Sequence, residues 1–99
     1  MRNERIQTLT LEFPNRSRSF DEARKAVRFS GYDGMIEVRF LVEAGALASP
    51  EAVQRGTETL EAGCLSAFDA LRLSIQDVAR EAYSHGRRNS YTLTAADFR

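Results

Sequence analysis

Side chains that could carry acid–base, nucleophilic or metal chemistry are few and widely separated in this sequence. His85 is the only histidine and Cys64 the only cysteine. A zinc site needs clustered Cys and His ligands, and acid–base catalysis needs a titratable group with a partner in reach. Gly31 and Gly34 do not precede a helix, as the glycines of a phosphate-binding loop would. The sequence therefore predicts no catalytic, cofactor-binding or metal-ligating residue, and a protein that is not an enzyme.

Arginine is the remaining side chain with a chemical preference of its own. Of the 14 basic residues, all but Lys25 are arginine, and guanidinium groups bind carboxylate and phosphate in a bidentate manner. The arginines of residues 12–34 and of the segment after the last helix, with one tyrosine, define a candidate interaction surface: Arg16, Arg18, Arg24, Arg28, Tyr32, Arg87 and Arg88. A composition bias is the alternative explanation, because 13 alanines and only three asparagines are typical of a GC-rich coding sequence.

Two kinds of partner suit these arginines. Phenylalanines lie between the basic residues, as they do in proteins that stack on single-stranded nucleic acid. However, Asp21 and Glu22 interrupt the basic segment, whereas binding to phosphates favours a stripe of one sign. We therefore expect a non-enzymatic protein-interaction or structural module. The alternative is a weak, salt-sensitive nucleic-acid binder that uses the basic N- and C-terminal segments.

Charge is unevenly distributed along the chain. Residues 1–28 carry seven basic and four acidic groups (net +3), residues 29–86 carry four and nine (net −5), and residues 87–99 carry three and one (net +2). We expect the basic ends to pack near the acidic middle. The sequence shows neither an apolar leader segment nor a run long enough for a membrane helix. With one cysteine, these features favour a cytoplasmic protein.

Alternating side chains predict a sheet over residues 7–42. Residues 7–13 and 35–42 alternate between apolar and mostly polar positions, and a short extended piece is expected near residues 17–20, followed by a turn at 21–24. A strand over 25–29, a five-residue reversal at 30–34 containing Asp-Gly and the strand over 35–42 form a hairpin. In this hairpin we expect Arg28 to face Glu37. Met35 and Leu41 lie opposite the apolar side of the last strand, so a second subunit could cover them in a homodimer.

A helical region is predicted over residues 50–85. Ser49-Pro50-Glu51 has the residue types of a helix start. The apolar positions that follow recur every three or four residues: Val53, Leu60, Cys64, Phe68, Leu71, Ile75, Val78 and Ala82. This stripe fits either one long helix or two helices broken near Gly63. His85 and Gly86 are suited to the helix end.

The C-terminal part, residues 90–98, predicts an edge strand at 91–93 and a helical turn that begins with the capping-box spacing Thr94 to Asp97. The chain is thus expected to form a single α+β domain over residues 1–99. In this domain a small antiparallel sheet of three or four strands packs on the helical region. The apolar side Ile36, Val38 and Phe40 is expected to meet Phe68, Leu71, Ile75 and Val78.

The chain also resembles the bacterial domain-of-unknown-function family DUF1488. The resemblance rests on short segments spread over nearly the whole chain: Phe13-Pro14-Asn15-Arg16, Phe20-Asp21-Glu22, Arg24, Ala26-Val27-Arg28-Phe29, Gly34, the strand to Val42, Ala67-Phe68, Arg72, Ile75, Ala79, Tyr83, Gly86 and Thr94-Ala95-Ala96-Asp97-Phe98. It implies a small α+β domain with an antiparallel sheet against a helix. It implies no activity, because the family carries no assigned catalytic residues.

Overall fold

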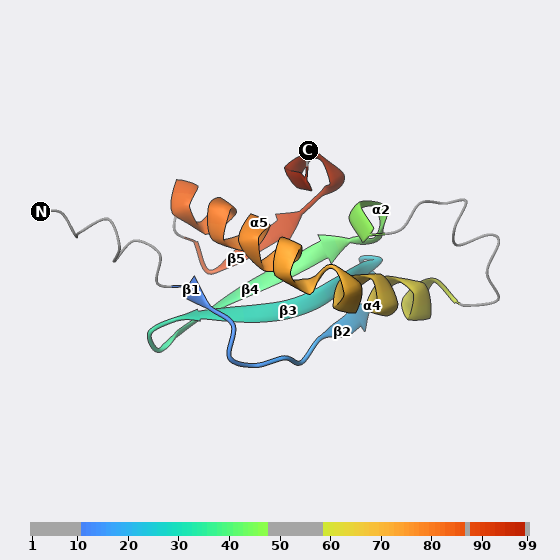
Figure 1. Cartoon of the computed structure of the whole chain (residues 1–99), viewed down its shortest axis with the longest axis horizontal. Helices are drawn as coiled ribbons and strands as arrows, with labels where there is room; N and C mark the ends of the chain where they lie inside the picture. Colours follow the sequence, from blue (N-terminus) through green and yellow to red (C-terminus); the bar gives the residue numbers. More distant parts are fainter. Residues whose placement is uncertain (1–10, 48–58, 87, 99) are drawn as a thin grey trace, which may run out of the picture.

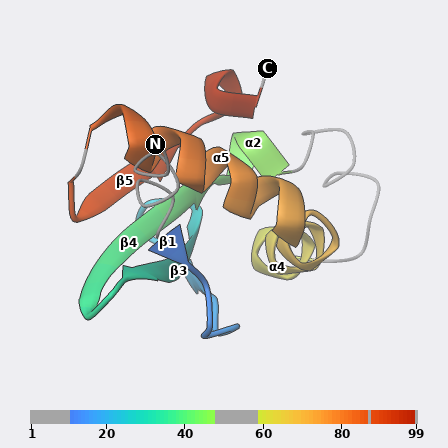
Figure 2. The same ribbon diagram turned by 60° about the vertical axis from the view of Figure 1, so that its left-hand side comes forward.

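The computed structural model describes residues 11–47, 59–86 and 88–98. Within these residues a sheet lies against helices that cover one of its faces (Figures 1 and 2). The elements in chain order are β1 (Leu11–Glu12), β2 (Ser19–Asp21), β3 (Ala26–Asp33), β4 (Ile36–Glu43), α2 (Ala44–Leu47), α4 (Leu60–Ala70), α5 (Arg72–His85), β5 (Ser90–Leu93) and the 3-10 helix η1 (Ala95–Phe98). The predicted α+β class is confirmed.

The described sheet is mixed and has five strands, which corrects the expectation of an antiparallel sheet of three or four strands. The strand order is β1-β3-β4-β5, and β2 also pairs with β3. All pairs are antiparallel except β4 with β5, which is parallel. The cause is the route of the chain: α4 and α5 run back across the sheet after β4, so β5 begins again at the end where β4 begins (Figure 1).

The β3–β4 hairpin is tighter than predicted. Asp33 pairs with Ile36, so the turn consists of Gly34 and Met35 alone rather than five residues. Gly34 has φ +64, which matches a two-residue turn with a glycine at its first position. The register also corrects the predicted contact between Arg28 and Glu37, because Arg28 lies opposite Leu41 and Glu37 opposite Tyr32.

The helical region is two helices, and the break lies at Leu71 rather than near Gly63. Gly63 lies inside α4, which begins with the Thr59 hydroxyl accepting a hydrogen bond from the Ala62 N–H at 3.1 Å. Leu71 leaves the helical conformation at φ −107 and ψ 16. Its side chain is 42% exposed, so the predicted apolar stripe is wrong at this position. The predicted start at 49–51 and Val53 lie outside the described residues.

The break changes which side of the second helix is buried. The buried side chains of α4, Cys64 and Phe68, were predicted, and so was Ile75 of α5, but α5 also buries Ala79 and Tyr83, which lie outside the predicted stripe. Val78 and Ala82 are only partly buried. A kink of this kind lets each helix direct its own apolar side to the twisted sheet below. Among the described residues, no helix has the length and apolar character to cross a membrane.

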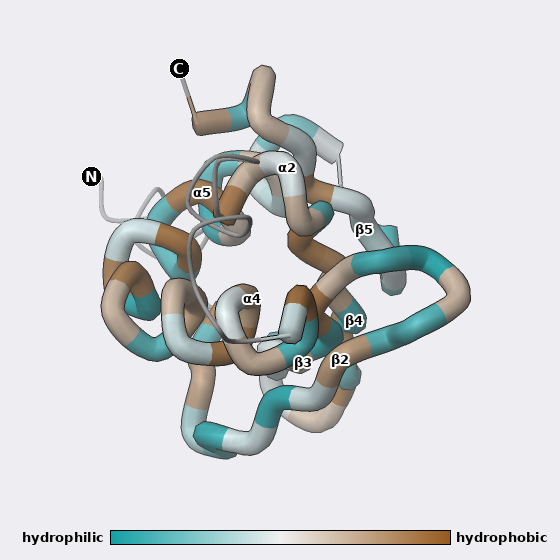
Figure 3. The backbone as a smooth tube through the Cα atoms, turned by 90° about the vertical axis from the view of Figure 1, so that its right-hand side faces the viewer, coloured by the Kyte–Doolittle hydropathy of each residue, from teal (hydrophilic) through white to brown (hydrophobic). Residues whose placement is uncertain are grey.

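The two ends of the sheet agree in part with the predictions. The strand predicted over 7–13 is observed only at Leu11–Glu12, and residues 1–10 lie outside the described part. The extended piece near 17–20 is β2, and the hydrophilic turn that follows it projects beyond the sheet (Figure 3). At the other end, Thr94 and Asp97 form the predicted box: the Thr94 N–H donates to Asp97 Oδ2 at 2.8 Å, and η1 follows.

Aromatic rings fill the space between the sheet and the helices. The Phe40 ring stacks on Phe29 with centroids 5.1 Å apart and on Tyr91 at 5.3 Å. Phe29 in turn meets Phe68 of α4 at 5.1 Å. Phe40 is completely buried, whereas Ile36 of the same predicted side is 60% exposed near the hairpin tip. The core therefore centres on the middle of β3, β4 and β5.

Replacement of Phe40 by alanine is expected to lower the free energy of unfolding by about 3–5 kcal/mol, because it leaves a cavity where three strands meet. Denaturant unfolding measures the loss. Met35→Ala is the control on the same strand hairpin; this side chain is 98% exposed, and its removal should change stability by no more than about 0.5 kcal/mol. Equal stability of Phe40→Ala and the wild type would contradict the assigned core.

Candidate functional site

The face of the sheet opposite the helices is uncovered in the described structure. Strand alternation and the register direct Arg28, Ser30 and Tyr32 of β3, and Glu37, Arg39 and Leu41 of β4, to this open face. A depression of about 660 Å³ lies here over β3, β4 and β5. Its lining includes four arginines and the outward side chains of β5: Asp21, Arg24, Arg28, Arg39, Leu41, Arg88, Ser90 and Thr92.

The depression follows from side-chain size. Ser90 lies beside Arg39 and Thr92 beside Leu41 in the β4–β5 register. The short side chains of β5 leave space that the long arginine side chains of the neighbouring strands border. Leu41 is half-buried at this position. The open face thus offers a small apolar floor with guanidinium groups around it.

Asp21 holds two of the four arginines in place. Its carboxylate accepts hydrogen bonds from the Arg24 N–H at 3.0 Å, from Arg24 Nη1 at 3.1 Å and from Arg28 Nη2 at 2.7 Å. The backbone hydrogen bond from Arg24 is the largest of the effects that lower the pKa of Asp21 to about 2. Asp21 is therefore ionised at neutral pH, and its carboxylate is engaged by both Arg24 and Arg28.

The other two arginines have donors to spare. Arg39 is 71% exposed, and its Nε lies 3.9 Å from Glu37 Oε1, which is a loose ion pair. Arg88 lies over the Tyr91 ring at 6.0 Å, and no carboxylate of the described residues forms an ion pair with it. The Arg88 N–H donates to the Tyr91 hydroxyl at 2.9 Å, and that hydroxyl donates to the Gly86 carbonyl. Both guanidinium groups can bind an added anion.

The structure gathers only part of the candidate surface. Arg24, Arg28 and Arg88 lie together, and Arg39, which sequence reasoning missed, joins them. The alternation of residues 35–42 could have indicated Arg39, because this pattern directs its side chain away from the core. Tyr32 lies on the same face but towards the hairpin tip, opposite Glu37. Arg16 is exposed in the segment between β1 and β2; Arg87 lies outside the described residues.

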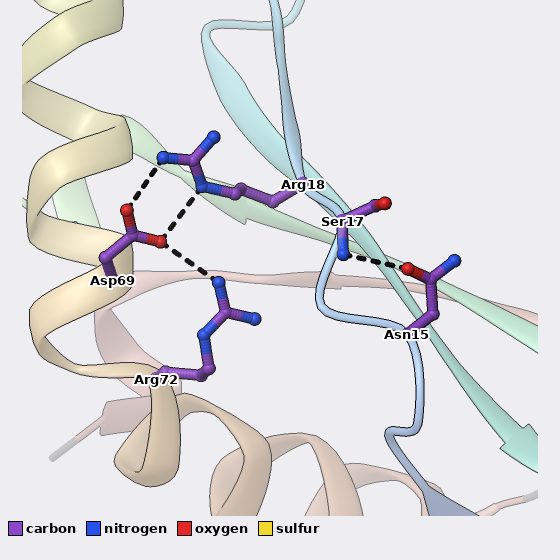
Figure 4. Close-up of polar contacts among 5 residues, drawn as sticks. All are labelled: Asn15, Ser17, Arg18, Asp69 and Arg72. Carbon is purple, nitrogen blue, oxygen red and sulfur yellow. Dashed lines mark hydrogen bonds and ion pairs between the residues drawn. The ribbon is translucent and has the colours of Figure 1, made fainter.

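Arg18 serves a different purpose. Its Nε and Nη2 donate to the two carboxylate oxygens of Asp69 in α4, at 2.9 and 2.7 Å, and Arg72 donates to the same carboxylate at 3.0 Å (Figure 4). The hydrogen bond from Arg18 is the main cause that lowers the pKa of Asp69. The arginine pair therefore fastens the segment before β2 to the helical layer, away from the open face.

The side chains with the most reactive chemistry lie elsewhere. Cys64 is buried, and burial raises the pKa of its thiol. His85 is exposed at the end of α5, with Nε2 at 2.9 Å from Glu81 Oε2. The Tyr83 hydroxyl donates to Asp33 at 2.6 Å and so connects α5 to the hairpin. In the described part of the chain, no three His, Cys, Asp or Glu residues lie close enough to hold a metal ion.

Asp21→Asn is expected to reduce stability and to weaken its dependence on pH. The folded pKa of about 2 lies below the ordinary aspartate pKa of 3.8, so the carboxylate stabilises the fold above the higher value and loses this effect as the pH falls through the lower one. Thermal unfolding should show a smaller fall in Tm between these two pH values for the variant than for the wild type. Glu22→Gln, at an exposed neighbour, is the control. Parallel curves for wild type and Asp21→Asn would contradict the role given to Asp21.

Comparisons with known proteins bear on the fold and on the family. The comparison with curated proteins gives no match. A crystal structure of a protein of unknown function from the DUF1488 family of Shewanella loihica PV-4 has 14% sequence identity to this chain and a TM-score of 0.66. The match covers 86% of this chain and 92% of the other, so the two share a fold. The family profile described as protein of unknown function (DUF1488) matches residues 11–94. The chain therefore belongs to the DUF1488 family, as the resemblance implied.

Proposed function

We propose that the protein is a non-enzymatic binding module that holds a partner protein on the open face of its sheet. The observation that carries the proposal is the depression over β3, β4 and β5, bordered by Arg24, Arg28, Arg39 and Arg88. One layer of helices covers the other face (Figure 2). The four arginines therefore lie where no described element covers the sheet.

The composition of this face favours a protein partner. Arginine and tyrosine are enriched at protein interfaces, where a buried apolar centre is surrounded by polar groups. Leu41 supplies the apolar centre, and Asp21 and Glu37 place negative charge among the arginines. Four arginines outnumber these two carboxylates, so the face suits an acidic protein surface that also supplies an apolar contact for Leu41. The engaged, ionised state of Asp21 supports binding rather than acid–base chemistry.

A different protein suits this face better than a second copy of the same chain. In a two-fold dimer each patch meets the same patch of its partner. The arginines around Leu41 would then approach their own copies at the centre of the interface, and like charges there oppose association. We therefore do not assign the open face to the homodimer that the apolar positions of residues 35–42 suggested.

Nucleic acid is the second candidate partner, because four arginines border one depression and guanidinium groups pair with phosphates. Binding of this kind releases counterions, so its affinity falls steeply as salt increases. If nuclease treatment removes the proteins captured with this chain, nucleic acid is the partner that it binds directly.

The double variant Arg39→Ala/Arg88→Ala should capture about one tenth of the partner protein that the wild type captures, or less. The reason is that it lacks two exposed positive charges that attract an acidic partner surface. Affinity capture of the tagged full chain from its native cytosol, with quantitative mass spectrometry and with nuclease added, measures the difference. Arg16→Ala, which removes an exposed arginine outside the depression, is the matched control and should behave as the wild type.

Two results would contradict the proposed function. Capture of the same proteins in the same amounts by the double variant would exclude the open face as the binding site. Loss of all partners on nuclease treatment, in wild type and control alike, would favour the nucleic-acid candidate instead.

A further inference from the structure

Strand β5 has a free edge beside the arginine-lined depression. It is the last strand in the order β1-β3-β4-β5, and no strand of the described residues pairs with its outer side. Such an edge presents unpaired backbone N–H and C=O groups, which another extended chain can bind. The edge is short, since β5 spans only Ser90–Leu93.

The register shows which residues supply the free groups. The Arg39 N–H donates to the Asn89 carbonyl at 2.9 Å, so Asn89 directs its backbone towards β4. Because backbone direction alternates along a strand, Tyr91 and Leu93 also direct their N–H and C=O groups to β4. Ser90 and Thr92 direct theirs outward.

The same two residues also line the depression with their side chains. An extended segment that pairs with the backbone of Ser90 and Thr92 would place every second side chain over the open face. These side chains would lie next to Arg39 and Arg88, which have donors to spare. Carboxylates at alternate positions of the segment would therefore meet guanidinium groups, in pairs that form charge-assisted hydrogen bonds.

We propose that β5 is the docking edge for an extended acidic segment of a partner protein, which adds to the sheet beside β5 and sets alternate carboxylates against Arg39 and Arg88. The proposal rests on the proposed function and specifies its partner. Charge selects the occupant, because the depression has four arginines and one carboxylate in its lining. A nucleic acid would satisfy the arginines but has no peptide N–H and C=O groups for the strand edge.

Two substitutions at Thr92 separate edge pairing from charge. Thr92→Pro removes an N–H that faces the free edge, and proline is tolerated in an edge strand when the lost N–H is on the outer side. The pairing of β4 with β5 should remain, which circular dichroism and thermal unfolding can verify. Thr92→Val keeps the N–H and replaces only the side-chain hydroxyl by a methyl group, so it is the matched control.

The test uses a short synthetic peptide of alternating glutamate and threonine, titrated into the full-length protein and followed by NMR and amide hydrogen exchange. We expect the Ser90 and Thr92 amides to become protected on binding. The affinity should fall at least about tenfold in Thr92→Pro and in Arg39→Ala/Arg88→Ala, but not in Thr92→Val or Arg16→Ala.

Three results would overturn the inference. If the peptide binds without protecting these amides, and Thr92→Pro binds it with unchanged affinity, then ion pairs with the arginines alone hold the peptide. Tighter binding of an oligothymidylate than of the peptide would assign the arginines to nucleic acid. Failure of the peptide to bind would exclude an acidic strand as the occupant; the capture experiment above would then decide separately whether the open face binds a protein at all.

Discussion

The stack of aromatic rings on the covered face determines how the rest of the molecule is organised. Phe29, Phe40 and Tyr91 come from three adjacent strands, and their rings lie nearly parallel, with interplanar angles of 16° and 13°. Phe68 brings α4 onto this stack. Side chains along a strand alternate between the two faces of the sheet. Because these rings point to one face, the residues next to them in the sequence point to the other face. The arginine-lined depression is thus the reverse side of the aromatic core.

Much of the core could be predicted from the sequence because a two-residue period leaves little choice. Once Val38 and Phe40 are assigned to the core, Arg39 must lie on the opposite face. Capping residues are similarly local, and the Thr94–Asp97 box forms as its spacing indicates. The helix break at Leu71 is different. Leucine favours helices, and the spacing of apolar residues continues without interruption across it, so only packing against the sheet reveals the break.

The direction of β5 and the composition of the candidate site depend on the whole fold. A strand of four residues carries no signal of whether it pairs in parallel; this is decided by the helices that return the chain across the sheet. For the same reason, sequence could gather arginines into a candidate surface but could not sort them. Arg18 is engaged by a carboxylate 51 residues away, whereas Arg88 retains free donors. Which guanidinium is available is therefore a tertiary property.

The parallel pairing of β4 with β5 has a consequence for how the chain folds while it is being synthesised. Strand β3 can pair with β4 once the hairpin has left the ribosome, but β5, the second neighbour of β4, follows only after α2, α4 and α5 in the chain. Until residues 90–93 emerge, β4 is itself a sheet edge, with apolar side chains on one side and little to cover them. Non-local pairing of this kind forms slowly and exposes the nascent chain to aggregation. Early formation of α4 and α5 over the hairpin would shield it while translation is completed.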